Sequence, residues 1–379
     1  MTRFTIKAQN FRVLERLDWS PEGVCLLSGA NGAGKSTVLD ALQFLRTLFM
    51  RGREAAFLKV GARYFRNVGV PESEPVVFEL RVADLVWKLR MPMAAAGIKG
   101  SFGEELYRAG QLVLRAEMFG REWQLGEKHL PLDQDRCCAK VLWDRGGDEE
   151  WMIPLFNTVG GIRVYEPFDL GKVKRSDSVE LFQNLLSTDG ANLWSVLAHW
   201  KTAAIRSEGR FEWVMATARE AFPGQISTVE FEQGLPMLYP PGTSDPDRGL
   251  PPGRAADGLI AGLLHLTAIA GASSGSLFAF DEIENHLHPH AIRTLLASIR
   301  ERADAQGLTV VLTTHSPVVM NQFRDDLEHV FVLERSDPSR TLPIAVTELH
   351  TEEWLAQAKL GTLYERLAFG SPLAKPPQP

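Results

Sequence analysis

Apolar and polar residues along the chain follow two periods, and the places where the period changes predict its elements. Residues 3–28 alternate between apolar and polar positions as paired strands do, and residues 74–91 repeat this alternation in a pattern typical of a hairpin. Residues 24–27 form a continuous apolar run, typical of a short buried strand, whereas residues 37–50 carry apolar residues at helical spacing. A buried strand therefore leads into a helix through the glycine-rich loop between them.

The rest of the chain alternates between strand-like and helical segments. Between residues 92 and 160 the pattern is weak, and the pieces predicted there as strands are 111–119, 121–125 and 140–144. Farther on, the periodicity predicts helices over 178–205 and 211–222, strands within 226–239, a long helix from about 258, a buried strand at 276–280, a helix from about 289 and a strand at 308–314. Strands that alternate with helices in this way predict an α/β protein.

The loop after the first buried strand fits the pattern G-x-x-x-x-G-K-[ST], with Gly29, Gly34, Lys35 and Ser36 in the required positions. Glycine allows backbone conformations closed to other residues, so successive N–H groups can turn inward and form a nest for phosphate oxygens. The N-terminus of the following helix adds its partial positive charge. The alternative is a glycine-rich turn without function, but the position between a strand and a helix favours nucleotide binding.

Each residue of this loop has an expected role in binding ATP together with Mg²⁺. Lys35 is expected to reach the β- and γ-phosphates, and the Ser36 hydroxyl is expected to ligate Mg²⁺. The remaining residues of the expected phosphate cradle and helix start are Asn31, Gly32, Ala33, Gly34 and Thr37.

A second group of polar residues follows the apolar run 277–280, a predicted buried strand that ends in Asp281 and Glu282. Asp281 can hold Mg²⁺ directly or through water. Glu282 is in position to polarise the water that attacks the γ-phosphate. The alternative is an acidic strand end without a catalytic role, and the phosphate loop elsewhere in the chain favours the catalytic interpretation.

A third element is the strand at 308–314, which is followed by His315. A histidine at the carboxyl end of a strand lies where ligands sit in open α/β sheets. A lone histidine at such a place would more often be structural. This one follows the acidic strand by one helix, so we expect it to hydrogen-bond the γ-phosphate or the attacking water.

Composition narrows the class of protein. The chain has 379 residues, of which 45% are hydrophobic and 23% charged, as in an ordinary globular protein. Its formal net charge of −6 argues against a surface built throughout for nucleic acid, although a local basic groove stays open. The cysteines Cys25, Cys137 and Cys138 form neither a disulfide framework nor a zinc spacing. Because the sequence shows no apolar signal core and no membrane-length apolar run, we expect a cytoplasmic protein with no membrane partner.

Lys35 and Asp281 stand far apart, so most of the chain lies between the two halves of the site. This arrangement resembles the ABC-type ATPases of the RecF/SMC branch and, more narrowly, the AAA_21 and OLD-like ATPases. The resemblance covers nearly the whole chain and is carried by GANGAGKST, LLSTDGANLWSVL (185–197), ADGLIAGLLHL (256–266), FDEIENHLHP, TTHSP and KLGTLYERLAFG (359–370). It implies an α/β P-loop NTPase fold of the ABC-ATPase type, with an antiparallel β subdomain and a mixed helical insert.

The resemblance also implies that two molecules sandwich two ATP molecules, each supplying a signature loop to the γ-phosphate held by the other. In this sequence that loop contains Asp257 and Gly258, and two departures from the family pattern stand out. Ala256 occupies the position where related proteins usually carry a serine, and no glutamine is clearly placed as the Mg²⁺-sensing lid residue after the first helix. Hydrolysis is therefore expected to be slow or to depend on a partner.

Two features suggest other chemistry, and both have a simpler explanation. His286 and His290 stand four residues apart, but a metal site needs a third ligand, and the proline between them is expected where the next helix opens. The basic residues Lys172, Lys174 and Arg175 can contact DNA phosphates, although solvated surface is the better interpretation.

Two groups of relatives are excluded by length and pattern. The region 92–225 has no heptad repeat, so the long coiled coils of SMC proteins are absent from the sequence. The chain after His315 is too short for the Toprim nuclease domain of the OLD nucleases.

The predicted organisation has four parts. They are 1–91, with the phosphate loop; 92–225, an inserted lid or arm; 226–370, with the signature loop, acidic strand and histidine; and 371–379, a disordered tail. We expect an ATPase that hydrolyses ATP to ADP and phosphate and acts as a nucleotide-driven homodimer switch. The resemblance implies a setting in phage defence beside a separate effector, a nuclease or toxin. Because the sequence carries no effector chemistry of its own, we expect the output to belong to that effector.

The sequence leaves two other functions to compare with this one. A RecF-like DNA repair or maintenance ATPase that binds DNA directly is the alternative. The ATPase subunit of a membrane transporter is disfavoured by the large insert and by the missing L-S-G-G-Q signature.

Overall fold

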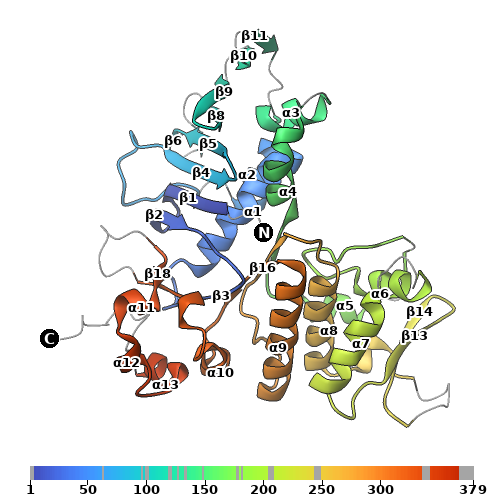
Figure 1. The fold of residues 1–379 in the computed structure, drawn as a ribbon. Helices are drawn as coiled ribbons and strands as arrows, with labels where there is room; N and C mark the ends of the chain where they lie inside the picture. Colours follow the sequence, from blue (N-terminus) through green and yellow to red (C-terminus); the bar gives the residue numbers. More distant parts are fainter. Residues whose placement is uncertain are drawn as a thin grey trace.

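The computed structural model describes most of the chain, with helices covering both faces of a parallel sheet and a second, antiparallel sheet beside it (Figure 1). The residues that it describes are 4–61, 64–94, 97–98, 102–117, 122–125, 128–131, 135–146, 149–175, 179–180, 182–203, 209–242, 249–334 and 342–366.

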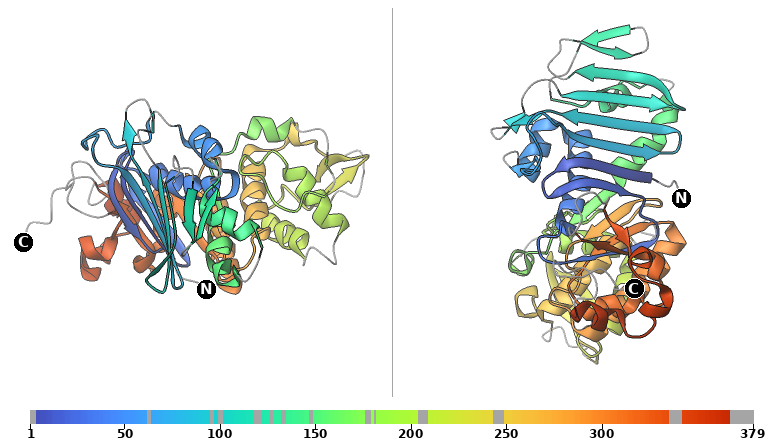
Figure 2. Two further views of the ribbon diagram at one scale, coloured as in Figure 1. Left: turned by 90° about the horizontal axis from the view of Figure 1, so that it is seen from above. Right: turned by 90° about the vertical axis from the view of Figure 1, so that its left-hand side faces the viewer.

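The larger sheet is antiparallel and has eight strands. Their order is β11 (Lys128–Pro131), β10 (Glu122–Leu125), β9 (Gln111–Glu117), β8 (Gly103–Arg108), β5 (Leu85–Met91), β4 (Val76–Val82), β1 (Phe4–Phe11) and β2 (Leu14–Trp19). Alternate residues of β4 and β5 are fully buried, because one face of the sheet covers a core. Figure 2 shows the β10–β11 end of this sheet projecting away from the parallel sheet, and a separate small hairpin joins β6 (Met93–Ala94) to β7 (Gly97–Ile98).

The second sheet carries the phosphate loop. Its order is β12 (Ile162–Tyr165), β15 (Leu277–Phe280), β16 (Thr309–Thr313), β3 (Val24–Gly29), β17 (Val330–Leu333) and β18 (Ile344–Ala345). The strands from β12 to β17 are mutually parallel, and β18 is antiparallel to its neighbour. Because parallel strands end at the same edge, the loops that follow β12, β15, β16 and β3 gather there.

Successive residues of β3 point into two different cores. Val24 and Leu26 belong to a core filled by helices, whereas Cys25 and Leu27 belong to the core beneath the antiparallel sheet. Every residue of β3 is buried, as in a parallel strand covered on both faces. The backbone that leads into the phosphate loop is therefore held from both sides.

Helices fill both layers. The core beneath the antiparallel sheet includes α1 (Lys35–Arg51), α2 (Arg53–Val60), α3 (Cys138–Asp144) and α4 (Ile153–Gly161). The other core includes α5 (Leu170–Lys174), α6 (Leu193–Thr202), α7 (Arg210–Ala221), α8 (Asp257–Ala270), α9 (Pro289–Gln306) and the hairpin of β13 (Thr228–Glu232) and β14 (Leu235–Tyr239). The C-terminal part adds α10 (Pro317–Met320), α11 (Val346–Leu349), α12 (Glu352–Leu355) and α13 (Leu360–Glu365). Short 3₁₀ turns lie at Glu149–Met152, Pro252–Arg254, Asn321–Phe323 and Leu327–His329.

The region expected to be an inserted arm, 92–225, contributes to several parts of the molecule. Its strands β8 to β11 extend the antiparallel sheet, and β12 pairs with β15 at the edge of the parallel one. Its helices α6 and α7 contact α8, and α7 also contacts α9. The domain boundaries at 92 and 225 stay predictions.

The strands and helices that bracket the phosphate loop, the acidic residues and His315 are confirmed, and two local predictions are wrong. The described residues of 178–190 were expected to be helical but form turns and irregular chain. The Asn192 side chain accepts a hydrogen bond from the Ser187 N–H at 2.8 Å, and Asp189 accepts one from the Ala191 N–H at 3.2 Å, so side chains satisfy backbone groups that a helix would use.

The second wrong prediction is the strand at 140–144, which lies in helix α3. Glu104 accepts hydrogen bonds from the N–H groups of Cys138 at 2.6 Å and Ala139 at 3.0 Å. This buried carboxylate on β8 holds the first turn of the helix, a contact that local periodicity cannot show. The predicted tail, 371–379, lies outside the described residues. In the part of the chain that the structure covers, no helix is long and apolar enough to cross a membrane.

Candidate nucleotide-binding site

The phosphate loop connects β3 directly to α1, and two of its glycines are required by the backbone. Gly29 has a φ of 154° and a side-chain Cβ there would lie 2.7 Å from the carbonyl oxygen of Leu333. Gly34 has a φ of 116° and forms the N-cap of α1 without a side-chain hydrogen bond. The first N–H groups of α1 thus have no side-chain cap and remain available to an anion.

The side chain of Lys35 lies folded over its own loop. Its Nζ donates hydrogen bonds to the carbonyl oxygens of Gly29 at 2.8 Å and Ala30 at 3.2 Å, and the residue is 6% exposed. Burial lowers the pKa of Lys35 to about 8, and the nearby carboxylates of Asp281 and Glu282 oppose this shift. The cation is therefore held at the place where phosphate oxygens would enter.

The two halves of the site meet at Asp281. The Ser36 hydroxyl donates a hydrogen bond to Asp281 Oδ2 at 2.9 Å, and the Thr313 hydroxyl donates one to Asp281 Oδ1 at 2.5 Å. A hydroxyl from the phosphate loop and a carboxylate from the acidic strand are hard oxygen donors, which suit Mg²⁺. These residues fit the metal that the fold implies, and Thr313 is a contributor that the sequence did not reveal.

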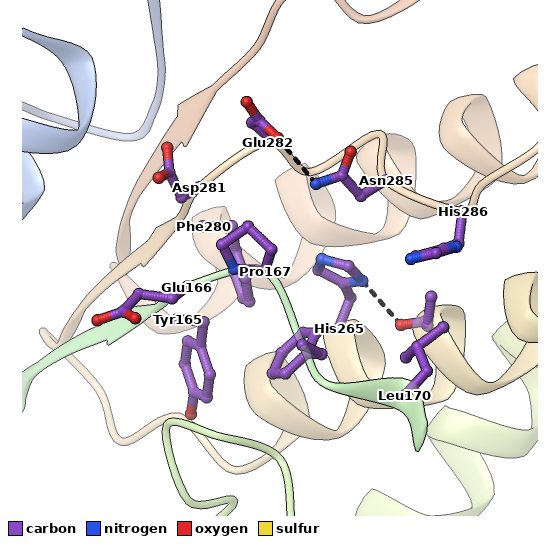
Figure 3. Close-up of a pocket in the computed structure, with 12 residues that line it drawn as sticks. Tyr165, Glu166, Pro167, Leu170, His265, Phe280, Asp281, Glu282, Asn285 and His286 are labelled. Carbon is purple, nitrogen blue, oxygen red and sulfur yellow. Dashed lines mark hydrogen bonds between the residues drawn. The ribbon is translucent and has the colours of Figure 1, made fainter. Parts of the chain in front are cut away.

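Glu282 is held in an uncommon conformation. Its φ is 52°, in the left-handed region that residues with a Cβ seldom occupy. Its backbone N–H donates to the Thr313 hydroxyl at 2.8 Å, and its Oε2 accepts from Asn285 Nδ2 at 3.0 Å. Figure 3 shows Asp281 and Glu282 together at the end of their strand, with the Glu282–Asn285 hydrogen bond. Such strain is common at functional sites, because surrounding contacts must maintain it.

His315 lies on the neighbouring strand end and is anchored at two points. Its backbone N–H donates to Glu284 Oε1 at 2.8 Å, and its Nδ1 contacts the Tyr364 hydroxyl at 3.0 Å. Tyr364 in turn donates to the Gly29 carbonyl oxygen at 3.4 Å, so it joins the histidine to the phosphate loop. Burial and the charge of Lys35 lower the pKa of His315, which makes the neutral imidazole the dominant form at neutral pH.

Glu166 is a further carboxylate at this edge that the sequence analysis missed. It follows the last residue of β12, whose Tyr165 carbonyl oxygen accepts a hydrogen bond from the Asp281 N–H at 3.0 Å. Its side chain is 62% exposed and pairs with Lys59 at 2.9 Å. In the sequence it follows IRVY (162–165), which Arg163 interrupts, so it lacks the continuous apolar run that identified Asp281.

A small cavity lies beneath these carboxylates, between β12, β15 and α8 (Figure 3). Its volume of about 20 Å³ is enough for a water molecule and far too small for a nucleotide. His265 lines it, and burial lowers the pKa of this histidine to about 4, with Nδ1 lying 2.7 Å from the Ala261 carbonyl oxygen. His265 is therefore a neutral core residue.

The predicted signature residues lie at the start of α8. Asp257 is its first residue and pairs with Lys174 of α5. A Cβ on Gly258 would lie 2.8 Å from the carbonyl oxygen of His286, so α8 packs closely against the loop that follows the acidic strand. Among the described residues, no hydrogen bond joins Asp257 or Gly258 to the phosphate loop of the same chain.

Two of the basic residues considered for DNA contact are engaged within the chain. Lys172 pairs with Asp189 at 2.6 Å and Lys174 pairs with Asp257. The structure thus gives these two cations partners of their own.

Two protein-family models match the chain. The P-loop containing region of the AAA domain (AAA_29) matches residues 5–57, which include the phosphate loop. The AAA domain described as putative AbiEii toxin, Type IV TA system (AAA_21) matches residues 180–321, which include the acidic strand and His315.

Individual proteins show shorter or looser likeness. A DNA replication and repair protein RecF from Herpetosiphon aurantiacus is 49% identical over 43 residues, which span 11% of this chain and 11% of that protein. An SMC head bound to the C-winged helix domain of ScpA is 13% identical over 83% of this chain and 90% of that chain, with a TM-score of 0.48. An SMC head domain from Thermotoga maritima is 14% identical over 87% of this chain and 94% of that chain, with a TM-score of 0.41.

The fold is a P-loop NTPase fold of the ABC type. The phosphate loop, the acidic strand and the histidine loop meet at one edge of its parallel sheet, and an antiparallel sheet lies beside it. Because both SMC TM-scores lie below 0.5, the narrower classification rests on the two family models and the RecF match. These matches support a likeness to the ABC-type, RecF/SMC-like ATPases, in agreement with the resemblance found in the sequence.

Proposed function

We propose that the chain binds ATP with Mg²⁺, hydrolyses it to ADP and phosphate, and uses this cycle as a dimer switch. The observation that carries the proposal is the 2.9 Å hydrogen bond between the Ser36 hydroxyl and Asp281, which joins the phosphate loop to the acidic strand. Lys35 is folded over the same loop. A cation and two oxygen donors thus surround the place that a triphosphate would take.

The phosphate loop would hold the nucleotide through its backbone and through Lys35. The N–H groups of residues 31–34 and the first turn of α1, including Thr37, would face the β- and γ-phosphates. When bound through Ser36 and Asp281, Mg²⁺ would supply positive charge against the phosphate oxygens. Lys35 would leave its carbonyl partners for the phosphates, which are better acceptors.

Glu282 is proposed as the general base that orients the attacking water. The hydrogen bond from Asn285 fixes one carboxylate oxygen and leaves the other available to a water proton. His315, neutral and tied to Tyr364, is proposed to hydrogen-bond the γ-phosphate or the same water.

The signature residues support a second copy of the chain as part of the site. Asp257 and Gly258 open α8, and helix N-termini favour anions. Within one copy they contact Lys174 and the loop at His286 rather than the phosphate loop, so a γ-phosphate contact would have to come from another molecule. We therefore propose that ATP binding brings two copies together as a homodimer.

The output of the switch is proposed to belong to a separate effector in phage defence. The description of the matching AAA_21 model as a putative AbiEii toxin of a Type IV TA system supports this setting. The alternative, a RecF-like ATPase that binds DNA directly, is supported by the short match to a DNA replication and repair protein.

Two measurements test the proposal. Purified full-length protein should release phosphate from ATP in the presence of Mg²⁺, and Lys35→Ala should reduce the release to background; equal rates would refute the assignment of the site. Native co-purification followed by mass spectrometry and nucleic-acid extraction distinguishes a chain that works with a separate effector from one that binds DNA directly. A co-purifying effector supports the first alternative, and bound DNA without an effector supports the second.

A further inference from the structure

A larger cavity, of about 690 Å³, opens between α1, α2, the start of β12 and the loop 185–189. Its described lining contains none of the phosphate-loop, acidic-strand or histidine-loop residues, so it is separate from the proposed ATP site. Four of the lining side chains are basic: Arg46, Arg51, Lys59 and Arg163. We refer to it as the basic cavity.

The arginines of the basic cavity come close enough to repel one another. Burial, together with the charges of Arg163 and Arg51, lowers the pKa of Arg46 to about 10. The Nε atom of Arg46 is buried and has no hydrogen-bond partner among the described residues. Arg163 is fixed at the wall, because its guanidinium donates to the carbonyl oxygens of Gly160 at 2.6 Å and Ile162 at 2.9 Å.

No carboxylate in the described part of the chain forms an ion pair with Arg46, Arg51 or Arg163. Asp189 is the carboxylate in the cavity lining, and it is held by Lys172 at 2.6 Å and by the Ser187 hydroxyl at 2.6 Å. Gathering like charges in a partly buried place without a counter-charge costs free energy. A bound anion would offset that cost.

The lining of the basic cavity suits a phosphate better than a halide. Guanidinium groups present paired donors that match phosphate oxygens. Leu58, which is 85% exposed, and Leu185, which is 43% exposed, line the cavity beside the arginines and offer apolar contact to a sugar or base. The volume is larger than a phosphate alone requires.

We propose that the basic cavity binds a phosphate-bearing ligand, with Arg46, Arg51 and Arg163 contacting the phosphate oxygens. A free nucleotide and the backbone of a single nucleic-acid strand both present this group. The inference does not depend on ATP hydrolysis, so the proposed ATPase function stands or falls separately.

The test uses the full-length chain carrying Lys35→Ala, which weakens phosphate binding at the proposed ATP site. The probes are inorganic pyrophosphate, measured by calorimetry at low salt, and a short fluorescent single-stranded DNA, measured by anisotropy. Arg51→Glu and Arg46→Gln are introduced singly. Arg16→Glu, on the exposed face of β2, makes the same charge reversal as Arg51→Glu away from the cavity and serves as the matched control.

We expect pyrophosphate to bind and each cavity variant to weaken binding by roughly tenfold or more, the scale of a lost charge-assisted hydrogen bond. Arg16→Glu should change the affinity by less than about twofold, since exposed distant charges are screened. Arg51 is exposed at the end of α1, so Arg51→Glu is expected to fold even if Arg46→Gln does not, and thermal melting checks both.

The two probes separate the sources of the phosphate. Binding of DNA that Arg51→Glu weakens, together with steep salt dependence, identifies a nucleic-acid strand as the ligand. Binding of pyrophosphate without DNA identifies a small phosphorylated ligand. The proposal is overturned if neither probe binds, or if a folded Arg51→Glu protein binds as tightly as the Arg16→Glu control.

Discussion

The Ser36 hydroxyl and the Asp281 carboxylate lie 2.9 Å apart, although most of the chain separates them in sequence. One comes from the first turn of α1 and the other from the end of β15, two strands away from β3 across the parallel sheet. Asp281 is also held by Thr313 of the intervening strand β16. Three neighbouring strand ends therefore set the position of one carboxylate, and the following predictions use that geometry.

Replacing Asp281 by Asn should weaken Mg²⁺-dependent ATP binding. The variant keeps the size of the side chain and removes the negative charge that would attract the metal. We expect a loss of affinity of roughly tenfold or more with Mg²⁺. Calorimetry with Mg²⁺ and with EDTA measures the difference; an equal loss in EDTA would show that Asp281 acts on the loop and not through the metal.

ATP binding should depend on pH through Lys35. Because the pKa of Lys35 in the free protein is lowered to about 8, the amine loses its proton above that pH, and phosphate binding must then take up a proton. The affinity should stay constant below about pH 8 and fall by about tenfold per pH unit above it. Fluorescence titration with ATP between pH 7 and 9.5 measures the affinity on both sides of this pKa. The titration extends about one and a half pH units to its alkaline side.

Lys35→Arg is the control for that pH dependence. A guanidinium stays protonated throughout the range, so the variant should bind with an affinity that does not change with pH, even if it is weaker. The same alkaline fall in Lys35→Arg would assign the titration to another group.

Glu282→Gln should bind ATP and Mg²⁺ but turn over roughly 10²-fold more slowly, the scale of one general base. The amide keeps the shape of the side chain, while the carboxylate that accepts or orients a proton is lost. Single-turnover phosphate release measures the chemical step, and light scattering shows whether ATP drives or closes a dimer in this variant. Full activity would mean that another residue positions the water, and His315 would be the first to examine.

Ala256→Ser adds the hydroxyl that related proteins usually carry before the signature Asp257. If the loop acts on ATP held by a second molecule, hydrolysis should become faster only at protein concentrations where dimers form. The specific activity measured over a dilution series is the readout. An equal rise in dilute monomer would contradict the sandwich arrangement.

Tyr364→Phe tests whether the tyrosine positions His315. The hydroxyl contacts Nδ1 of His315 at 3.0 Å and the Gly29 carbonyl oxygen at 3.4 Å, so its removal releases the ring without removing it. We expect a reduced kcat with little change in KM, since the phosphate loop keeps its own contacts. A larger KM at unchanged kcat would assign Tyr364 to nucleotide binding.

The parts of the site that could be predicted from sequence are those with a local signal. Gly29 to Ser36 form a fixed spacing between a strand and a helix, and Asp281 and Glu282 follow an apolar run directly. Glu166 lacks this signal, because Arg163 interrupts the apolar residues before it. Local periodicity was enough in these places because the strands are buried on both faces.

The remaining features depend on contacts between distant segments. Tyr364 contacts His315 although the two residues lie far apart in sequence. Thr313 donates a hydrogen bond to Asp281 because their strands, β16 and β15, are neighbours in the sheet. Helix α3 begins where Glu104, on another strand, accepts hydrogen bonds from its first N–H groups. No window of sequence contains both partners of such a contact, so neither its existence nor its effect on local structure could be predicted.

Lys59 belongs to two neighbourhoods: it lines the basic cavity, and its ammonium pairs with Glu166 at the strand end beside Asp281. A phosphate that drew Lys59 toward the cavity would leave Glu166 without its cation and make the field at Asp281 more negative. Thermodynamic linkage then requires the effect to run both ways, so occupancy of either place changes the affinity of the other by the same factor. Because Lys59 and Glu166 are 41% and 62% exposed, that factor should be about fivefold or less. A coupling of this size lets a ligand in the basic cavity change the affinity for ATP slightly, without switching ATP binding on or off.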